Sequence, residues 1–194
     1  MRWLRKFFSR SVAPGDDRVW DQPNPSVLSL HPNVVRTTYK AFAPGRQDRV
    51  EFCVFWYGMR INANEAKVSA VVVPEQRNTP GNYRVLPKAM DAVLEATRPR
   101  GWVNLAQLHT HPGEWVGHSQ YDDEMANSRR ALSLVFPRFG RPSRSWIRKI
   151  GVHEFIAGEW RRLSVRRVKE RLRLNRHCDT PVLLDLRNHD RHEL

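Results

Sequence analysis

Residues 108–126, LHTHPGEWVGHSQYDDEMA, combine a strand end, a Pro-Gly turn and a helix start. Two histidines, His109 and His111, are separated by one residue, and the carboxylate of Asp122 follows eleven positions later. Alternate residues of a strand point to the same face, so both imidazoles can reach one ion. Catalytic zinc uses three such protein ligands and keeps its fourth position for a water. We therefore predict one Zn²⁺ per chain at these three side chains.

The elements around this stretch follow from hydrophobic periodicity. A strand is predicted over residues 102–111, and one of its faces carries Val103, Leu105, Gln107, His109 and His111. Residues 112–118 predict a loop, and Ser119 opens a helix that reaches about Leu132. Ser119 followed by Asp122 is also typical of a helix capping box. The two interpretations are compatible, because a cap fixes the helix start and with it Asp122.

A second stretch, residues 50–58 (VEFCVFWYG), predicts a buried strand because it is dense in β-branched and aromatic residues. Alternation places Glu51 on the same face as Cys53, Phe55 and Tyr57. A carboxylate at the start of such a strand is costly to bury without a partner.

The rest of the chain interleaves helices and strands. The pattern predicts helices from Asn33 to before Pro44 and over 84–98, strands over 67–73 and 132–136, loops over 13–33, 75–82 and 137–145, and a hairpin over 147–165 that turns at 157–159. The predicted fold class is therefore mixed α/β (α+β).

The length of 194 residues and a hydrophobic content of 40% fit one domain with terminal extensions. We expect a basic arm and Pro-rich linker over 1–32, a central domain over 33–165 and a basic C-terminal extension over 166–194. Residues 1–12 are basic and amphipathic, which is typical of a helix that binds a membrane surface or a partner. The alternative is an arm that packs on its own domain or stays disordered.

Composition limits the location and the partners. No run of about 18 apolar residues is present, so no transmembrane helix is expected. Two cysteines, Cys53 and Cys178, are too few for a disulfide framework and fit a reducing, cytoplasmic protein.

The net charge is +13, which favours nucleic acid or an acidic protein surface as a partner. The alternative is an arginine-rich, solvated surface, because no nucleic-acid motif accompanies the charge. Basic residues are dense between Arg161 and Arg176, where apolar spacing permits an amphipathic helix.

One motif resembles the signature of the JAMM/MPN (JAB-domain) zinc metalloproteases. It consists of His-x-His-Pro, then six residues and a Ser, then two residues and an Asp. The chain matches it without a gap at His109, His111, Pro112, Ser119 and Asp122. The family also has a glutamate at the start of an upstream buried strand, and Glu51 fits that position. Other upstream carboxylates, which lie in predicted loop, turn and helix positions, are Glu65, Glu75 and Glu95. The resemblance covers roughly residues 33–160.

The resemblance implies a curved mixed sheet flanked by helices, of the cytidine-deaminase-like class. It implies that His109, His111 and Asp122 bind zinc. It also implies that Glu51 acts as general base and then acid, and that Ser119 donates to the oxyanion of a tetrahedral intermediate.

Members of this family hydrolyse isopeptide or peptide bonds next to the C-terminal tail of ubiquitin or ubiquitin-like proteins. The chain resembles the small bacterial JAB proteins that accompany ubiquitin-like conjugation systems, including antiphage operons. We expect the tail to bind by strand addition. The alternatives are a catalytically silent MPN scaffold and a protein that binds nucleic acid or an acidic partner. Trp115 is either a substrate platform or a packed loop residue, and His118 is interpreted as a surface or substrate-contacting residue.

Overall fold

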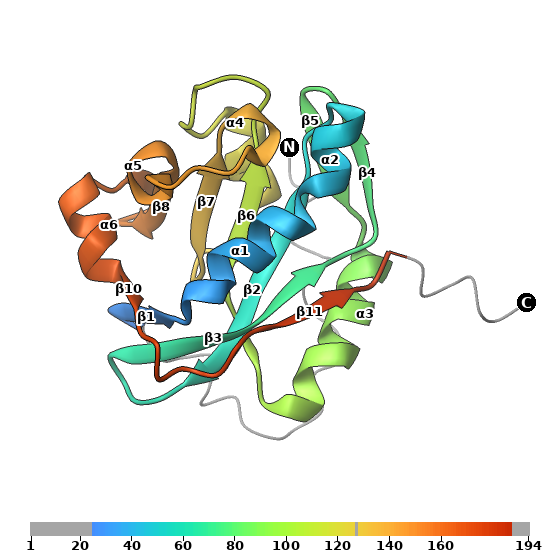
Figure 1. The fold of residues 1–194 in the computed structure, drawn as a ribbon. Coiled ribbons are helices and arrows are strands. Elements are labelled where there is room, and N and C mark those ends of the chain that lie inside the picture. The colour runs from blue at the N-terminus through green and yellow to red at the C-terminus, as the bar shows by residue number, and fades with distance from the viewer. Residues whose placement is uncertain (1–24, 127, 188–194) are drawn as a thin grey trace, which may run out of the picture.

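The computed structural model describes residues 25–126 and 128–187, which form a curled mixed sheet flanked by helices (Figure 1). The strands of this sheet are β1 (Val27–Leu30), β2 (Cys53–Arg60), β3 (Glu65–Val73), β6 (Val103–Thr110), β7 (Leu132–Phe136), β8 (Gly151–Ile156), β9 (Glu159–Arg162), β10 (Leu172–Leu174) and β11 (Val182–Asp185). A separate hairpin consists of β4 (Gln76–Thr79) and β5 (Asn82–Val85). The α-helices are α1 (Pro32–Ala41), α2 (Ala43–Asp48), α3 (Pro87–Thr97), α4 (Gln120–Met125), α5 (Trp146–Lys149) and α6 (Val165–Arg171).

The sheet order is β10-β1-β3-β2-β6-β7-β8-β9, and β11 also pairs with β3. The central strand β2 is antiparallel to both β3 and β6, whereas β6 and β7 run parallel. One face packs on α1, α5 and α6 to form the larger core, and α3 covers the other face over a smaller core. The predicted mixed α+β class with helices on a curved sheet is confirmed at this level.

The predicted alternation along β2 is confirmed. Val54 and Trp56 lie in the larger core, whereas Cys53, Phe55 and Tyr57 lie in the smaller one. Side chains of a strand point alternately to opposite faces, so a strand covered on both sides is apolar throughout.

The side chains of β6 that were predicted to share one face do so near the histidines but not at the start of the strand. Gln107 contacts Tyr83 in the smaller core, but Val103 and Leu105 contribute to the larger core. The pairing of β2 with β6 changes register between Ala106 and Asn104, so Leu105 has no partner in the ladder. A bulge of this kind turns the strand and re-aims its side chains, which parity alone cannot anticipate.

The β4–β5 hairpin replaces the loop predicted over 75–82, and it extends to Val85, so the helix predicted from residue 84 begins only at Pro87. Its polar sequence is stabilised by tertiary contacts: the side-chain oxygen of Gln76 accepts from the Cys53 amide, and its nitrogen donates to the Cys53 carbonyl, both at 2.8 Å. The helix that begins after Ser119 ends at Met125 rather than near Leu132. Residues 146–149 form α5, so the predicted hairpin begins later, at β8.

Segments near both ends of the described chain belong to the same sheet. β1 lies inside the stretch predicted as a linker, and it pairs in parallel with both β3 and β10. The apolar C-terminal segment forms β11, also parallel to β3. The helix predicted over residues 1–12 lies outside the described residues. In the part of the chain that is described, no helix has the length and apolarity needed to cross a membrane.

Arg171 of α6 connects three parts of the fold. Its guanidinium donates to the Glu154 carboxylate on β8 at 2.5 Å and to the Pro25 carbonyl ahead of β1. Its side chain is 8% exposed, so the charge depends on these acceptors. Removing one partner of such a buried ion pair leaves the charge of the other buried without a counter-charge, which is destabilising.

We expect Arg171→Ala to lower the free energy of unfolding by about 3 kcal/mol, because Glu154 loses its partner. The exposed Arg166, which pairs with Glu170 on the same helix, should cost less than about 1 kcal/mol when replaced by alanine. Urea unfolding of both variants measures the difference. Equal losses would contradict the role given to Arg171.

Candidate metal centre

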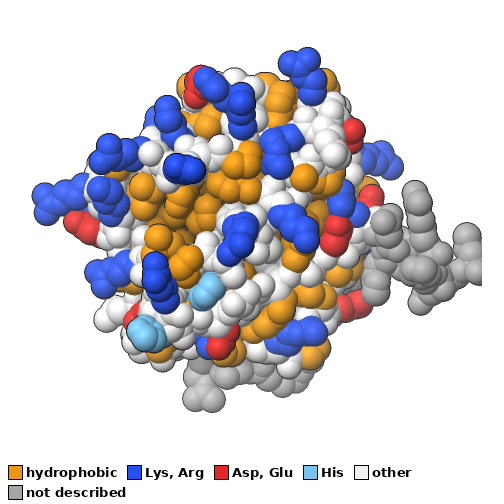
Figure 2. Space-filling model, in the orientation of Figure 1, with side chains coloured by type: hydrophobic (Ala, Val, Ile, Leu, Met, Phe, Trp, Pro, Cys, Tyr) orange, Lys and Arg blue, Asp and Glu red, His pale blue; other side chains and the backbone are white. Residues whose placement is uncertain are grey.

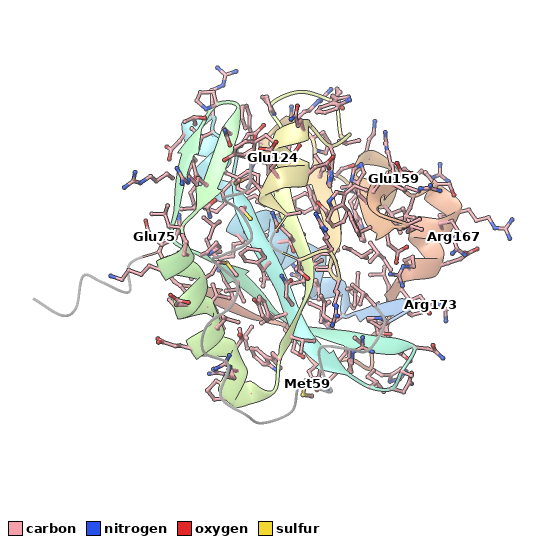
Figure 3. The ribbon with its side chains drawn as sticks, turned by 180° about the vertical axis from the view of Figure 1, so that it is seen from behind. Met59, Glu75, Glu124, Glu159, Arg167 and Arg173 are labelled. Atoms are coloured by element: carbon pink, nitrogen blue, oxygen red, sulfur yellow. The ribbon has the colours of Figure 1, made fainter. Side chains whose placement is uncertain are left out.

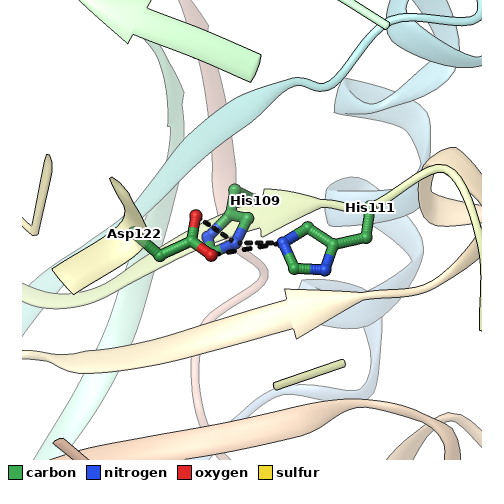
Figure 4. A group of neighbouring side chains, drawn as sticks. All are labelled: His109, His111 and Asp122. Carbon is green, nitrogen blue, oxygen red and sulfur yellow. Dashed lines mark hydrogen bonds and ion pairs between the residues drawn. The ribbon is translucent and has the colours of Figure 1, made fainter. Parts of the chain in front are cut away.

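The three predicted ligands come together at the end of β6. His109 is on the strand, His111 follows its last residue, and Asp122 lies in the first turn of α4. Figure 4 shows the three side chains converging. All three are buried, with exposures of 1%, 5% and 4%. Within the described residues, these three form the group of His, Cys, Asp or Glu side chains whose ligand atoms are close enough to hold one metal ion.

The spacing of the ligand atoms fits a small tetrahedral cation. The Nε2 atoms of His109 and His111 are 3.1 Å apart, and the Asp122 oxygens lie 3.1 Å from the first and 3.4 Å from the second. Ligands about 2.0–2.1 Å from a tetrahedral zinc are separated by about 3.3 Å. The donor set and its spacing therefore suit Zn²⁺.

His111 is oriented by the loop that follows it. Its Nδ1 is 3.1 Å from the Trp115 carbonyl oxygen. A carbonyl can only accept, so Nδ1 carries the proton and Nε2 presents its lone pair to the site. A second hydrogen bond of this kind is the usual way in which proteins fix a metal-binding imidazole.

His109 is held by packing. Tyr83 of the hairpin stacks on its imidazole, with ring centroids 5.1 Å apart. The Tyr83 hydroxyl accepts from Gln107 at 2.9 Å. No hydrogen-bond partner of His109 Nδ1 is found among the described residues, so the ring is fixed by stacking and by contacts at Nε2. Burial lowers the pKa of His109, which favours the neutral form that metals require.

Asp122 is fixed by the predicted capping box. The Ser119 amide and hydroxyl both donate to Asp122 Oδ2 at 2.7 Å, and the Asp122 amide donates to Ser119 Oγ at 3.2 Å. Burial alone would raise the pKa of Asp122, but the neighbouring imidazoles of His109 and His111 and the hydrogen bonds of the cap hold that pKa well below its usual range. The carboxylate is therefore ionised.

Glu51 lies two residues before β2, because the strand begins at Cys53 rather than at residue 50 as predicted. Its amide donates to the Thr79 carbonyl of the hairpin at 2.9 Å. The next residue, Phe52, exchanges hydrogen bonds with Thr110 at the end of β6. Burial raises the pKa of Glu51 to about 7, with the Asp122 carboxylate adding to the rise and His111 opposing it.

These groups share one pocket of about 290 Å³. It is lined by Glu51, Gly81, His111, Pro112, Gly113, Trp115, Ser119, Tyr121 and Asp122. Of the five predicted site residues, Glu51, His111, Ser119 and Asp122 line this pocket, and His109 does not. The carboxylates proposed as alternatives to Glu51, at positions 65, 75 and 95, do not line it.

The interpretation of His118 as a surface residue is wrong. Its side chain is 6% exposed, its Nε2 is 2.8 Å from the Ser133 hydroxyl, and its ring stacks on His153 at 4.0 Å. Asp123 pairs with His118 at 2.7 Å, so Asp122 is the carboxylate that faces the two ligand histidines. Tyr83 was not anticipated, because the hairpin that carries it was predicted as a loop.

No protein-family model matches the chain, and no curated protein matches it. Its structure is similar to the solution structure of protein DSY2949 from Desulfitobacterium hafniense, with a TM-score of 0.57 and 17% identity. That likeness covers 87% of this chain and 100% of the other. A protein from Salinibacter ruber has a TM-score of 0.47 and 18% identity, over 70% of this chain and 88% of that one. The first likeness supports the general fold class and carries no information on activity.

Proposed function

We propose that the chain is a zinc-dependent isopeptidase or peptidase of the JAMM/MPN type. The proposed substrate is a ubiquitin-like protein, cleaved after its C-terminal tail during deconjugation or precursor processing. The observation that carries the proposal is the position of the buried Glu51 carboxylate, in the same pocket as the His109–His111–Asp122 group. A cytoplasmic location belongs to this proposal, and both cysteines, Cys53 and Cys178, are free.

When bound, zinc would supply Lewis acidity and make water a stronger acid. Glu51 would accept a proton from that water and pass it to the leaving amine. A pKa near 7 suits both steps, because the group can be deprotonated before the reaction and protonated during it.

Ser119 would have two successive roles. In this structure its hydroxyl donates to Asp122 and so orients a ligand. Donation to an oxyanion, which the family resemblance implies, requires the hydroxyl to turn from Asp122 towards the pocket that it lines. The amide of Ser119 continues to hold Asp122 during that movement.

The complete ligand set distinguishes this proposal from a silent scaffold, which needs neither a buried acidic pair nor converging histidines. Burying such groups without a bound cation is unfavourable. A scaffold that evolved only to bind a partner would gain nothing from that arrangement.

We expect purified protein to hold one zinc ion per chain and Asp122→Asn to lose most of it, because one anionic ligand is removed. The matched control is Asp123→Asn, which changes the neighbouring carboxylate on the same helix and should retain the metal. Elemental analysis after dialysis measures both. Undamaged wild-type protein without stoichiometric zinc would overturn the whole proposal.

We expect Glu51→Gln to retain zinc but to cleave a reporter fused through a ubiquitin-like tail about 10²–10⁴-fold more slowly, since the proton acceptor is removed. Glu75→Gln makes the same change at an exposed carboxylate of the adjacent hairpin and should be unaffected. Single-turnover rates under matched zinc content provide the test. Full activity of Glu51→Gln would exclude its assignment as the base.

A second candidate function is binding of nucleic acid, and the charge distribution favours it. Residues 141–176 contain twelve Lys and Arg but three Glu, a net +9 of the total +13. All three glutamates pair with arginines of the same segment. Figure 2 shows Lys and Arg spread over one face with few acidic groups, and Figure 3 places Arg167 and Arg173 on the same side of the molecule.

If this face binds nucleic acid, Arg148→Glu with Lys149→Glu should weaken binding of a labelled 20-nucleotide single strand at least tenfold and reduce its salt dependence. The control, Arg77→Glu with Arg84→Glu on the hairpin, removes the same charge elsewhere. Fluorescence anisotropy over a salt series provides the readout. Equal weakening by both pairs would indicate a non-specific charge effect, and stronger binding to polyglutamate would indicate an acidic protein partner.

A further inference from the structure

Trp115 is exposed, with 57% of its surface accessible. The other large apolar side chains that are exposed among the described residues are aliphatic. The indole of Trp115 stacks on the imidazole of His111, with ring centroids 5.1 Å apart and planes inclined by 14°. One face of the indole therefore covers a candidate metal ligand. The accessible remainder lines the pocket that contains Glu51.

The position of this indole is set by the surrounding loop. A Cβ atom at Gly117 would lie 2.8 Å from Cζ2 of Trp115, so only glycine leaves room for the ring there. The Trp115 carbonyl is engaged by His111, and the Gly113 carbonyl accepts from the Arg138 amide at 2.8 Å. An ion pair between Glu114 and Arg138 connects the same two segments.

A fixed, accessible indole is suited to binding. Keeping a large aromatic surface in water is unfavourable, and ordering it in advance reduces the entropy lost when a ligand stacks on it. Tryptophan is also enriched among the residues that dominate binding energy at interfaces. Loop packing alone does not account for Trp115, because more than half of its surface contacts no protein atom.

We propose that the accessible part of Trp115 is a subsite for an apolar or aromatic side chain of the substrate, next to the bond that is cleaved. The inference rests on the proposed peptidase function and deepens it by naming a specificity residue. Trp115, Pro112 and Tyr121 give the pocket apolar walls, which favour an apolar or aromatic side chain over a charged one. The opposite side is open at Gly81, where an added Cβ would meet nothing within 4 Å.

Binding can be tested without catalysis. The seven indole N–H signals of ¹⁵N-labelled, zinc-loaded protein would be recorded by NMR, and the Trp115 signal identified by its absence in Trp115→Ala. N-acetylphenylalaninamide should shift that signal progressively, and N-acetylalaninamide and N-acetylaspartamide should not. An unshifted Trp115 signal, or a larger shift with N-acetyllysinamide than with the phenylalanine derivative, would overturn the subsite.

Specificity is tested on ubiquitin-like fusions that carry Phe, Leu, Ala or Asp after the cleaved bond. Wild type should prefer Phe and Leu over Ala by about tenfold in kcat/KM, mainly through KM, because the interaction forms on binding. Trp115→Ala should abolish the preference while retaining the carbonyl that orients His111. Gly117→Ala, which displaces the indole, should do the same.

Trp102→Phe is the control, because Trp102 lies at the far end of β6 in the smaller core. It should keep the preference unchanged. A preference that persists in both Trp115→Ala and Gly117→Ala would overturn the proposal. If no fusion is cleaved but the Trp115 signal still shifts, the peptidase proposal fails and the apolar subsite remains.

Discussion

The Asp122 carboxylate is the group on which the candidate site depends. It accepts two hydrogen bonds from Ser119 at the start of α4 while facing both ligand histidines. A helix cap is a local interaction, set by residues three apart. The capping box of Ser119 and Asp122, a local feature, therefore positions the only acidic residue among the three candidate ligands. Disrupting the cap would free the helix start and the ligand together, so local stability and metal affinity are linked at this residue.

The central sheet brings the other groups to that carboxylate. Cys53 of β2 pairs directly with His109 of β6, and Glu51 lies two residues before Cys53 on the same side of β2. The proposed base and a candidate ligand, 58 residues apart in the sequence, are thereby placed at one end of two adjacent strands. Thr110 extends the connection, because its hydroxyl and amide both bond to Phe52. The register of β2 and β6 therefore sets how far Glu51 lies from His109 and His111.

Much of this arrangement follows from sequence, for identifiable reasons. Alternation along β2 and the Ser119–Asp122 spacing depend on local periods of two and three residues, and both are found in the structure. The bulge at Leu105 and the β4–β5 hairpin were not predicted, because each depends on distant partners, such as the bidentate contact of Gln76 with Cys53. His118 was misplaced for the same reason. Ser133, its hydrogen-bond partner, lies on a strand that only tertiary structure brings near.

The β4–β5 hairpin has a consequence for any attempt to change specificity. Its carbonyl at Thr79 holds Glu51, its Tyr83 ring stacks on His109, and its turn at Gly81 borders the pocket. Replacing the whole hairpin would thus remove contacts that hold the proposed base, Glu51, and a candidate ligand, His109, at the same time. Only the turn itself, residues 80 and 81, lies outside the paired strands of the hairpin. The loop of residues 112–118 makes none of those hairpin contacts, but the Trp115 carbonyl in it orients His111. Substitutions of its side chains that keep this backbone in place are therefore expected to change what the pocket binds without moving the proposed base or the candidate ligands.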